Sequence, residues 1–330
     1  MSRLSQIKDL IAKSSQSFQD GDFNKALKLS QKLIQAGAPQ GYMVKYRCHA
    51  MRNQVQEALH CLREYTQAFP EDIVAWKSLA EFCRDHDYFD EGIKAYDRAL
   101  ECEDAPLEKI FLARASIKVR ARDFNSALGD LEKIGESEEL SLAVEVMKLS
   151  CLNGLDKSQE VLELAPSVME KVQISAETNP SRSIPMMNYN TRFEIAYAHW
   201  KTSKDRSKAL HSLFQALRHI KVAPPPALEL LREINAQESN DHCKLFGIVV
   251  TAKTIEPVMQ HGHPHEDFVR QYDVVAEDPE ECLEFICELE TEIKSNSLRI
   301  RKFQENPDLE VGAFKGVYFQ SLPELLHHHH

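Results

Sequence analysis

The chain has 330 residues and a formal net charge of −11, a length that allows a repeat domain and a small second domain. Residues 241–326 hold 17 Asp and Glu against 8 Lys and Arg, so the acidic excess lies near the carboxy terminus. Because no basic field attracts phosphates, nucleic-acid binding is not expected. No apolar run approaches the ~20 residues of a membrane-spanning helix. With no secretory leader pattern either, we expect a cytoplasmic protein without a membrane partner.

A pattern of small residues, each opening a second helix, recurs along the first two-thirds of the chain. The small residues are Ala26, Ala58, Gly92, Ala127 and Ala209. The first four are separated by 32, 34 and 35 residues. This spacing predicts stacked units that bury their apolar faces only against neighbours. A degenerate unit and a proline-containing insertion are expected at 141–189.

One segment shows the packing rule most clearly. Large residues (Trp76, Leu79, Tyr96) alternate at helical spacing with small ones (Ala80, Gly92, Ala99), as two closely packed antiparallel helices require. In this pattern, residues 5–223 resemble the tetratricopeptide repeat (TPR) family. The resemblance implies a mainly α fold, a right-handed α-solenoid of about six helix pairs within residues 1–236, which holds a protein or peptide.

The first helix of each pair lines a concave groove in that family. The resemblance therefore implies a binding surface that alternates cations with adaptable apolar groups and suits an extended peptide with carboxylates. For any single position, an exposed helix residue without a ligand remains the alternative. The implied groove residues are Lys8, Met43, Arg47, Met51, Lys77, Glu81, Arg84, Leu112, Ser116 and Arg120.

After residue 236 the helical period gives way to β-branched and aromatic runs, which predict a small acidic α+β domain at 241–322. Its helix is expected to begin at Pro279, after an Asp278 cap, and to continue to Arg301. Residues 325–330 are expected to be a purification tag. The expected strands are 243–253, 268–276 and 315–320.

Three histidines, His261, His263 and His265, precede Glu266 and Asp267 in a segment expected to form a hairpin loop. Imidazole and carboxylate groups can bind a transition metal, so a metal-dependent enzyme or effector with its site here is the alternative function. No motif for nucleotide, nucleophile or zinc-protease chemistry occurs elsewhere. The favoured interpretation is a non-enzymatic scaffold without a cofactor, which binds a protein or peptide and whose acidic domain caps or regulates the groove.

Overall fold

The computed structural model describes residues 3–135, 138–178, 183–218, 220–260, 263–290, 293–306, 311–321 and 324–325. At 138, 257–260, 263–266 and 324–325 the description is limited to the backbone. The chain forms two compact units, residues 1–144 and residues 145–330.

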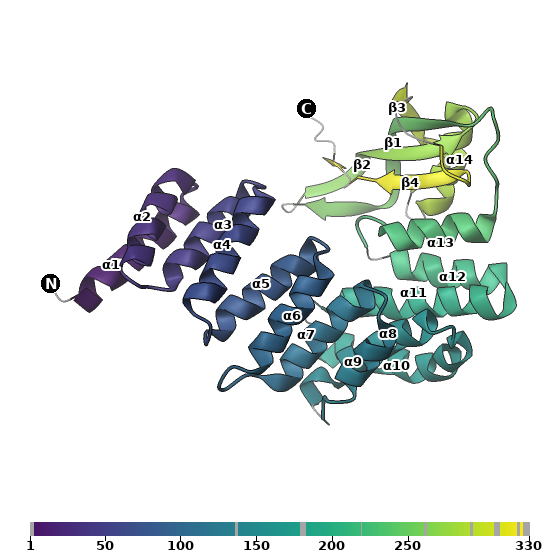
Figure 1. Ribbon diagram of the computed structural model, residues 1–330. Helices are drawn as coiled ribbons and strands as arrows, with labels where there is room; N and C mark the ends of the chain where they lie inside the picture. The colour runs from purple at the N-terminus through teal and green to yellow at the C-terminus, as the bar shows by residue number, and fades with distance from the viewer. Residues whose placement is uncertain are drawn as a thin grey trace. The chain divides into compact units, whose positions relative to one another are not determined.

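The first unit consists of consecutive antiparallel helices joined by short turns (Figure 1). Helices pack in sequence order, each against the next, which confirms the expected helix pairs. The helices are α1 (Arg3–Gln19), α2 (Phe23–Gln35), α3 (Gln40–Met51), α4 (Val55–Ala68), α5 (Ile73–Asp85), α6 (Phe89–Leu100), α7 (Leu107–Arg120) and α8 (Phe124–Leu131), followed by α9 (Glu138–Gly154), which runs into the second unit.

A left-handed backbone residue occupies the same place in the turn of every pair. These residues recur at intervals of 32, 34, 35, 34 and 48 along the chain. A positive φ reverses the chain tightly between two helices, so the repeated geometry identifies six pairs in the described residues. The longer last interval accommodates the extended α10 and the segment that follows it. The turn residues are Gly21, Asn53, Asp87, Arg122, Asp156 and Lys204.

Aspartates fix several helix starts. The carboxylates of Asp22, Asp123 and Asp205 each accept a hydrogen bond from the backbone N–H three residues later. Such N-caps satisfy a donor that the first helical turn leaves free, and each contributes about 1 kcal/mol. The cap therefore reinforces the turn that precedes α2, α8 and α12.

The core of the first unit is densest around the segment with the clearest repeat pattern. Leu79, Ala80, Tyr96 and Ala99 are each at most 4% exposed. At Gly92, an added Cβ would lie 3.1 Å from the Cβ of Cys83, so the α5–α6 contact requires a small residue there. The predicted large–small interdigitation is confirmed.

The second unit begins with helices and ends with a sheet. Residues 141–176, expected to form a degenerate repeat, lie in α9 and in α10 (Ser158–Thr178). The remaining helices of this part are α11 (Ile184–Ser203), α12 (Arg206–Leu217) and α13 (Pro225–Asn235).

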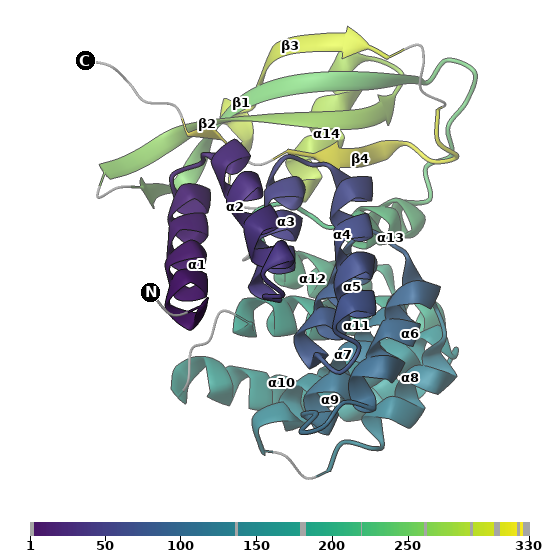
Figure 2. The ribbon, with the colours of Figure 1, turned by 60° about the vertical axis from the view of Figure 1, so that its left-hand side comes forward.

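The antiparallel sheet has the order β3-β1-β2-β4, with β5 paired to β2 (Figures 1 and 2). The long hairpin of β1 and β2 forms its centre, and α14 (Pro279–Leu289) contacts β1–β4. The sequence thus correctly predicts a small α+β fold. The strands are β1 (Lys244–Gln260), β2 (His263–Ala276), β3 (Arg299–Glu305), β4 (Gly316–Gln320) and β5 (Glu324–Leu325).

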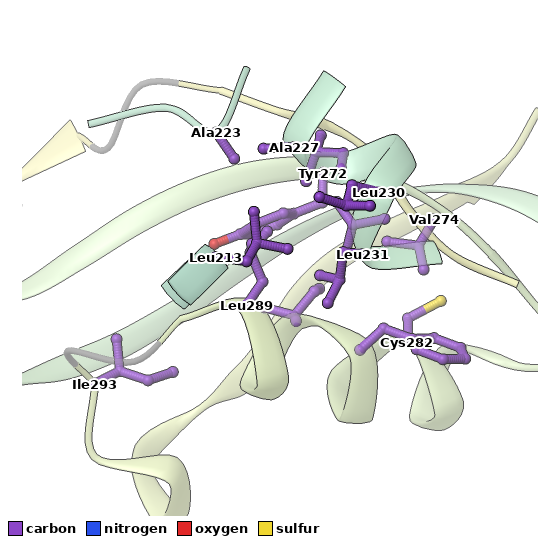
Figure 3. Packing of buried hydrophobic residues seen from close by; sticks show 14 of the residues in the cluster. Leu213, Ala223, Ala227, Leu230, Leu231, Tyr272, Val274, Cys282, Leu289 and Ile293 are labelled. Carbon is purple, nitrogen blue, oxygen red and sulfur yellow. The ribbon is translucent and has the colours of Figure 1, made fainter. Parts of the chain in front are cut away.

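One hydrophobic core joins the last helices to the sheet. Leu213 of α12 and Leu231 of α13 lie in the same buried cluster as Tyr272 of β2 and Leu289 of α14 (Figure 3). Burying such a side chain stabilises the fold by about 1.5–3 kcal/mol. A boundary at 236/241 remains a prediction about where helices give way to strands, but the core of the second unit continues across it.

Two expectations for the second unit are wrong. The helix that starts at Pro279 ends at Leu289 rather than Arg301, and Arg299–Glu305 is strand β3. The chain leaves the helix because Glu290 accepts hydrogen bonds from Arg270 and Tyr272 on β2, which anchors its side chain against the sheet. The expected histidine loop is also shorter, since the backbone from His263 onward is in β2.

No helix in the described part of the chain has the length and apolar composition that a bilayer span requires.

Candidate functional site

The first helices of the first three pairs are joined by contacts between predicted groove residues and their neighbours. The Arg47 guanidinium on α3 lies 4.4 Å above the Phe18 ring of α1. The Ser78 hydroxyl on α5 donates to the Met43 sulfur on α3 at 3.6 Å. We call the surface of α1, α3, α5 and α7 that carries the ten predicted residues the first-helix face.

The amino-terminal part of the first-helix face holds positive charge without carboxylate partners. Lys8 of α1 and Arg47 of α3 are exposed, and Lys77 of α5 is half-buried. Within the described residues, none of these three cations forms an ion pair. Met51, at the end of α3, is 65% exposed. This part of the face therefore combines available cations with an exposed thioether.

Arg84 and Glu81 on α5 lie near a buried hydroxyl. Arg84 pairs with Asp85 at 2.9 Å, so its charge is partly balanced. Beneath them, Tyr96 of α6 is fully buried and its hydroxyl has no hydrogen-bond partner among the described atoms. Burial, with a further contribution from the negative charge of Glu81, raises the pKa of Tyr96 to about 12. The phenol thus stays protonated at neutral pH.

The carboxy-terminal part of the first-helix face, on α7, does not offer an unpaired cation among the predicted residues. Leu112 and Ser116 of α7 are half-buried. Arg120, at the end of α7, pairs with Asp87 at 2.7 Å and lies 5.7 Å from the Phe89 ring centre. The charge of Arg120 is therefore balanced by a carboxylate in the α5–α6 turn. Binding of a ligand by any of the ten residues stays a prediction.

A buried ionic cluster in the fourth pair was missed by the sequence reasoning. Asp130 of α8 is 1% exposed and accepts bonds from Arg114 Nε at 2.8 Å, Arg114 Nη2 at 2.5 Å and Lys118 Nζ at 2.7 Å. Arg114 also bonds Asp97 of α6. Burial by itself would raise the pKa of Asp130, but these hydrogen bonds from Arg114 and Lys118 outweigh it and hold the pKa below its usual value.

The repeat register contained the signal for this cluster. Moving the third pair forward by 35 residues superimposes three buried apolar positions on three charged ones. An ionic set therefore replaces an apolar set in the next repeat. The positions pair as Leu79 with Arg114, Cys83 with Lys118, and Ala95 with Asp130.

Polar residues also line a surface hollow of about 440 Å³ between α3 and α4. Lys45 pairs there with Glu64 at 2.8 Å, and His60 lies 3.4 Å from the same carboxylate. His49 bonds Gln54 through Nδ1 at 2.9 Å. These groups largely satisfy one another, so the hollow carries no specific ligand assignment.

A second buried polar cluster lies in the second unit. Glu194 of α11 accepts hydrogen bonds from Ser150 at 2.5 Å and Asn153 at 2.7 Å, both on α9, and no cation pairs with it among the described residues. Burial raises the pKa of Glu194. Burial also raises the pKa of the nearby Cys151 thiol to about 12, so this thiol is unreactive at neutral pH.

The candidate metal ligands lie mostly outside the described structure. His261 is not described, and for His263, His265 and Glu266 the description is limited to the backbone of β2. Asp267 stands opposite Lys253 of β1, with 4.0 Å between the charged atoms. Among the described side chains, no group of three His, Cys, Asp or Glu residues has metal-binding geometry.

Comparisons with known proteins address the fold alone. No family model and no curated protein sequence matches the chain. The chain is similar to the crystal structure of PilW, a type IV pilus biogenesis factor, at 12% identity and a TM-score of 0.48, over 68% of this chain and 98% of that one. A tetratricopeptide repeat protein from Parabacteroides merdae is similar at 13% identity and a TM-score of 0.46, over 70% and 99% of the two chains.

A third similar structure is YrrB, described as a TPR protein with an unusual peptide-binding site, at 15% identity and a TM-score of 0.39, over 63% of this chain and 96% of that one. The repeat assignment rests on the helix pairs of this chain. Six pairs with one turn geometry, and an interdigitated large–small core in the third, make its helical part an array of tetratricopeptide-like repeats.

Proposed function

We propose that the chain is a non-enzymatic interaction scaffold that binds an extended, acidic protein segment on its first-helix face. The observation that carries this proposal is the set of unpaired cations on three successive first helices, Lys8, Arg47 and Lys77. Elsewhere in the first unit many cations pair with carboxylates, for example Arg63 with Glu91 at 2.6 Å. An acidic ligand would supply the missing partners.

The geometry at Arg47 supports a carboxylate ligand in particular. Its guanidinium lies over the Phe18 ring, and no described carboxylate occupies its N–H donors. Stacking holds a guanidinium in place and leaves the in-plane donors free for bidentate binding of a carboxylate. Met43 and Leu112, both half-buried, offer adaptable apolar contact to the rest of the segment.

We further propose that the acidic domain at 241–322 caps the last helices. Leu228 and Leu231 of α13 are at most 5% exposed and share the core with the sheet. Without the sheet, this apolar face would meet water, a common difficulty at the end of a repeat array. Deleting the domain would expose that core, so surface charge variants of the full chain are the better test of any regulatory role.

The binding proposal can be tested by selecting peptides from a library displayed on phage. The test variant combines Arg47→Glu and Lys77→Glu. The matched control combines Lys28→Glu and Lys94→Glu, which reverse exposed, unpaired cations on the second helices α2 and α6. The wild type and both variants are compared as the same 330-residue chain.

We expect selection to enrich peptides rich in Asp and Glu, and their affinity to fall at least tenfold in the test variant while the control retains it. The affinity should also weaken as salt rises, because exposed charges are screened. Enriched peptides that bind both variants equally would place the binding surface elsewhere.

A further inference from the structure

The two edges of the carboxy-terminal sheet differ in how their backbone is protected. Along β4, the Arg232 side chain of α13 donates to the Val317 carbonyl at 2.6 Å. The Lys315 N–H donates to the Gln237 carbonyl at 2.7 Å, just before that strand. At the opposite edge, β3 has β1 as its one strand neighbour, and no other described segment pairs with it. Within the described residues, the β3 edge is therefore open.

The open edge also gathers the positive charge of an acidic domain. Of the eight Lys and Arg residues at 241–326, Arg299, Arg301 and Lys302 lie on β3. All three are exposed, and none forms an ion pair within the described residues. By contrast, Lys315 pairs with two carboxylates at 2.7 and 2.9 Å. Among the acidic residues of this domain that the structure describes, none pairs with these three cations.

The strand register assigns the β3 side chains to faces. Arg299 and Lys302 stand opposite Thr251 and Val249 on the sheet face away from the core. Arg301 is the extra residue where the register shifts. Phe303 stands opposite Ile248 on the core side, touches the Phe246 ring edge-on and is still 51% exposed. The edge therefore presents cations on one face and an incompletely covered aromatic ring on the other.

We propose that an acidic, extended segment of another protein adds to the sheet along β3. Its backbone would pair with the open edge, as in other cases of strand addition. Its carboxylates would lie beside Arg299 and Lys302, and its alternate apolar side chains would cover Phe303. A second copy of this edge is the poorer occupant, because it would bring Arg and Lys side chains against one another. This site lies on a different unit from the first-helix face and does not depend on it.

The probe for this site is a synthetic seven-residue peptide of alternating Glu and Val, capped at both ends and labelled with a fluorophore. One control peptide has the same sequence with N-methyl groups on its valines, which removes backbone donors and keeps the charge. A second control has Lys in place of Glu. Binding to the full-length chain is measured by fluorescence anisotropy at low and physiological salt.

The test variant combines Arg299→Glu and Lys302→Glu, exposed changes that leave the core intact. A control is Lys208→Glu on α12, an exposed cation of the same unit that pairs with Asp205 at 3.5 Å. The Arg47→Glu and Lys77→Glu variant separates this site from the first-helix face.

We make the β3 and Lys208→Glu changes in the Arg47→Glu and Lys77→Glu background, where the first-helix face does not compete for an acidic peptide. In that background we expect the Glu–Val peptide to bind equally with and without Lys208→Glu, and at least tenfold more weakly with the β3 changes. Both control peptides should bind at least tenfold more weakly than the Glu–Val peptide in the same background. Hydrogen exchange of the β3 amides should slow when the Glu–Val peptide is bound. The proposal is overturned if the peptide does not bind, if its N-methylated form binds as well, or if the β3 variant keeps its affinity.

Discussion

Removing the Asp130 carboxylate should destabilise the first unit strongly. In an Asp130→Ala variant, Arg114 and Lys118 would remain in the repeat core without the group that accepts three of their hydrogen bonds. Removing one partner of a buried ion pair typically costs 3–5 kcal/mol, because the remaining charge is left uncompensated. Half-exposed Asp97 still accepts a hydrogen bond from Arg114 and partly compensates its charge. We therefore expect a loss at the lower end of this range, about 3 kcal/mol.

The neighbouring repeat supplies the matched control. A triple variant, Arg114→Leu, Lys118→Cys and Asp130→Ala, installs the apolar residues found 35 positions earlier. Replacing a complete buried ionic set by apolar groups is often neutral or stabilising, by up to roughly 4 kcal/mol. The free energy of unfolding of the triple variant should therefore be no more than about 1 kcal/mol below that of the wild type, although the variant contains the damaging Asp130→Ala change.

Urea unfolding followed by circular dichroism at 222 nm measures these differences. Because the chain has two units, hydrogen exchange of the α7 and α8 amides should locate the loss in the first one. A loss below about 1 kcal/mol in Asp130→Ala, or a triple variant as unstable as the single one, would show that Asp130 does not compensate the two buried cations.

Three further outcomes follow from buried groups. The folded-state pKa of Asp130 is lowered, so its ionised carboxylate stabilises the fold above the ordinary Asp pKa, and this effect is lost as pH falls through the folded-state pKa. The difference in free energy of unfolding between the wild type and Asp130→Ala should therefore shrink in unfolding curves recorded at acid pH. The folded-state pKa of Glu194 is raised, so ionisation opposes folding as pH rises above the unfolded value. The melting temperature of Glu194→Gln should therefore rise relative to that of the wild type as the pH is raised from 4 to 8. A difference in melting temperature that does not change with pH would contradict this. Tyr96→Phe removes an unsatisfied buried hydroxyl and should leave stability unchanged or raise it by about 1 kcal/mol in urea titrations; a loss above about 2 kcal/mol would reveal a missing partner.

The repeat fold could be predicted because its signals are local and periodic. Small residues such as Ala80 and Gly92 occur where helices touch, and the chain reverses near Gly21 and Asp22. The Pro279 helix was predicted too long because Leu289 and Ile293 continue its apolar period. The contact that ends it, Glu290 with β2, joins residues about 20 positions apart and leaves no local pattern.

The candidate site could be predicted less well. Residue type and repeat position placed Lys8, Arg47 and Lys77 on first helices, but pairing depends on neighbours from other repeats. Arg120 appeared equivalent to Arg47 in the sequence, yet Asp87, 33 residues away, neutralises it. The open edge of β3 was missed for a similar reason, since a helix was expected over Arg299.

Hydrogen exchange in the presence of a selected acidic peptide is the decisive test of the claim that the first-helix face binds an acidic segment. We expect slower exchange in α1, α3 and α5 on binding, with α2, α4 and α6 unchanged, and no slowing in the Arg47→Glu and Lys77→Glu variant at the same peptide concentration. Slowing confined to the second helices, or to the carboxy-terminal sheet, would contradict the claim.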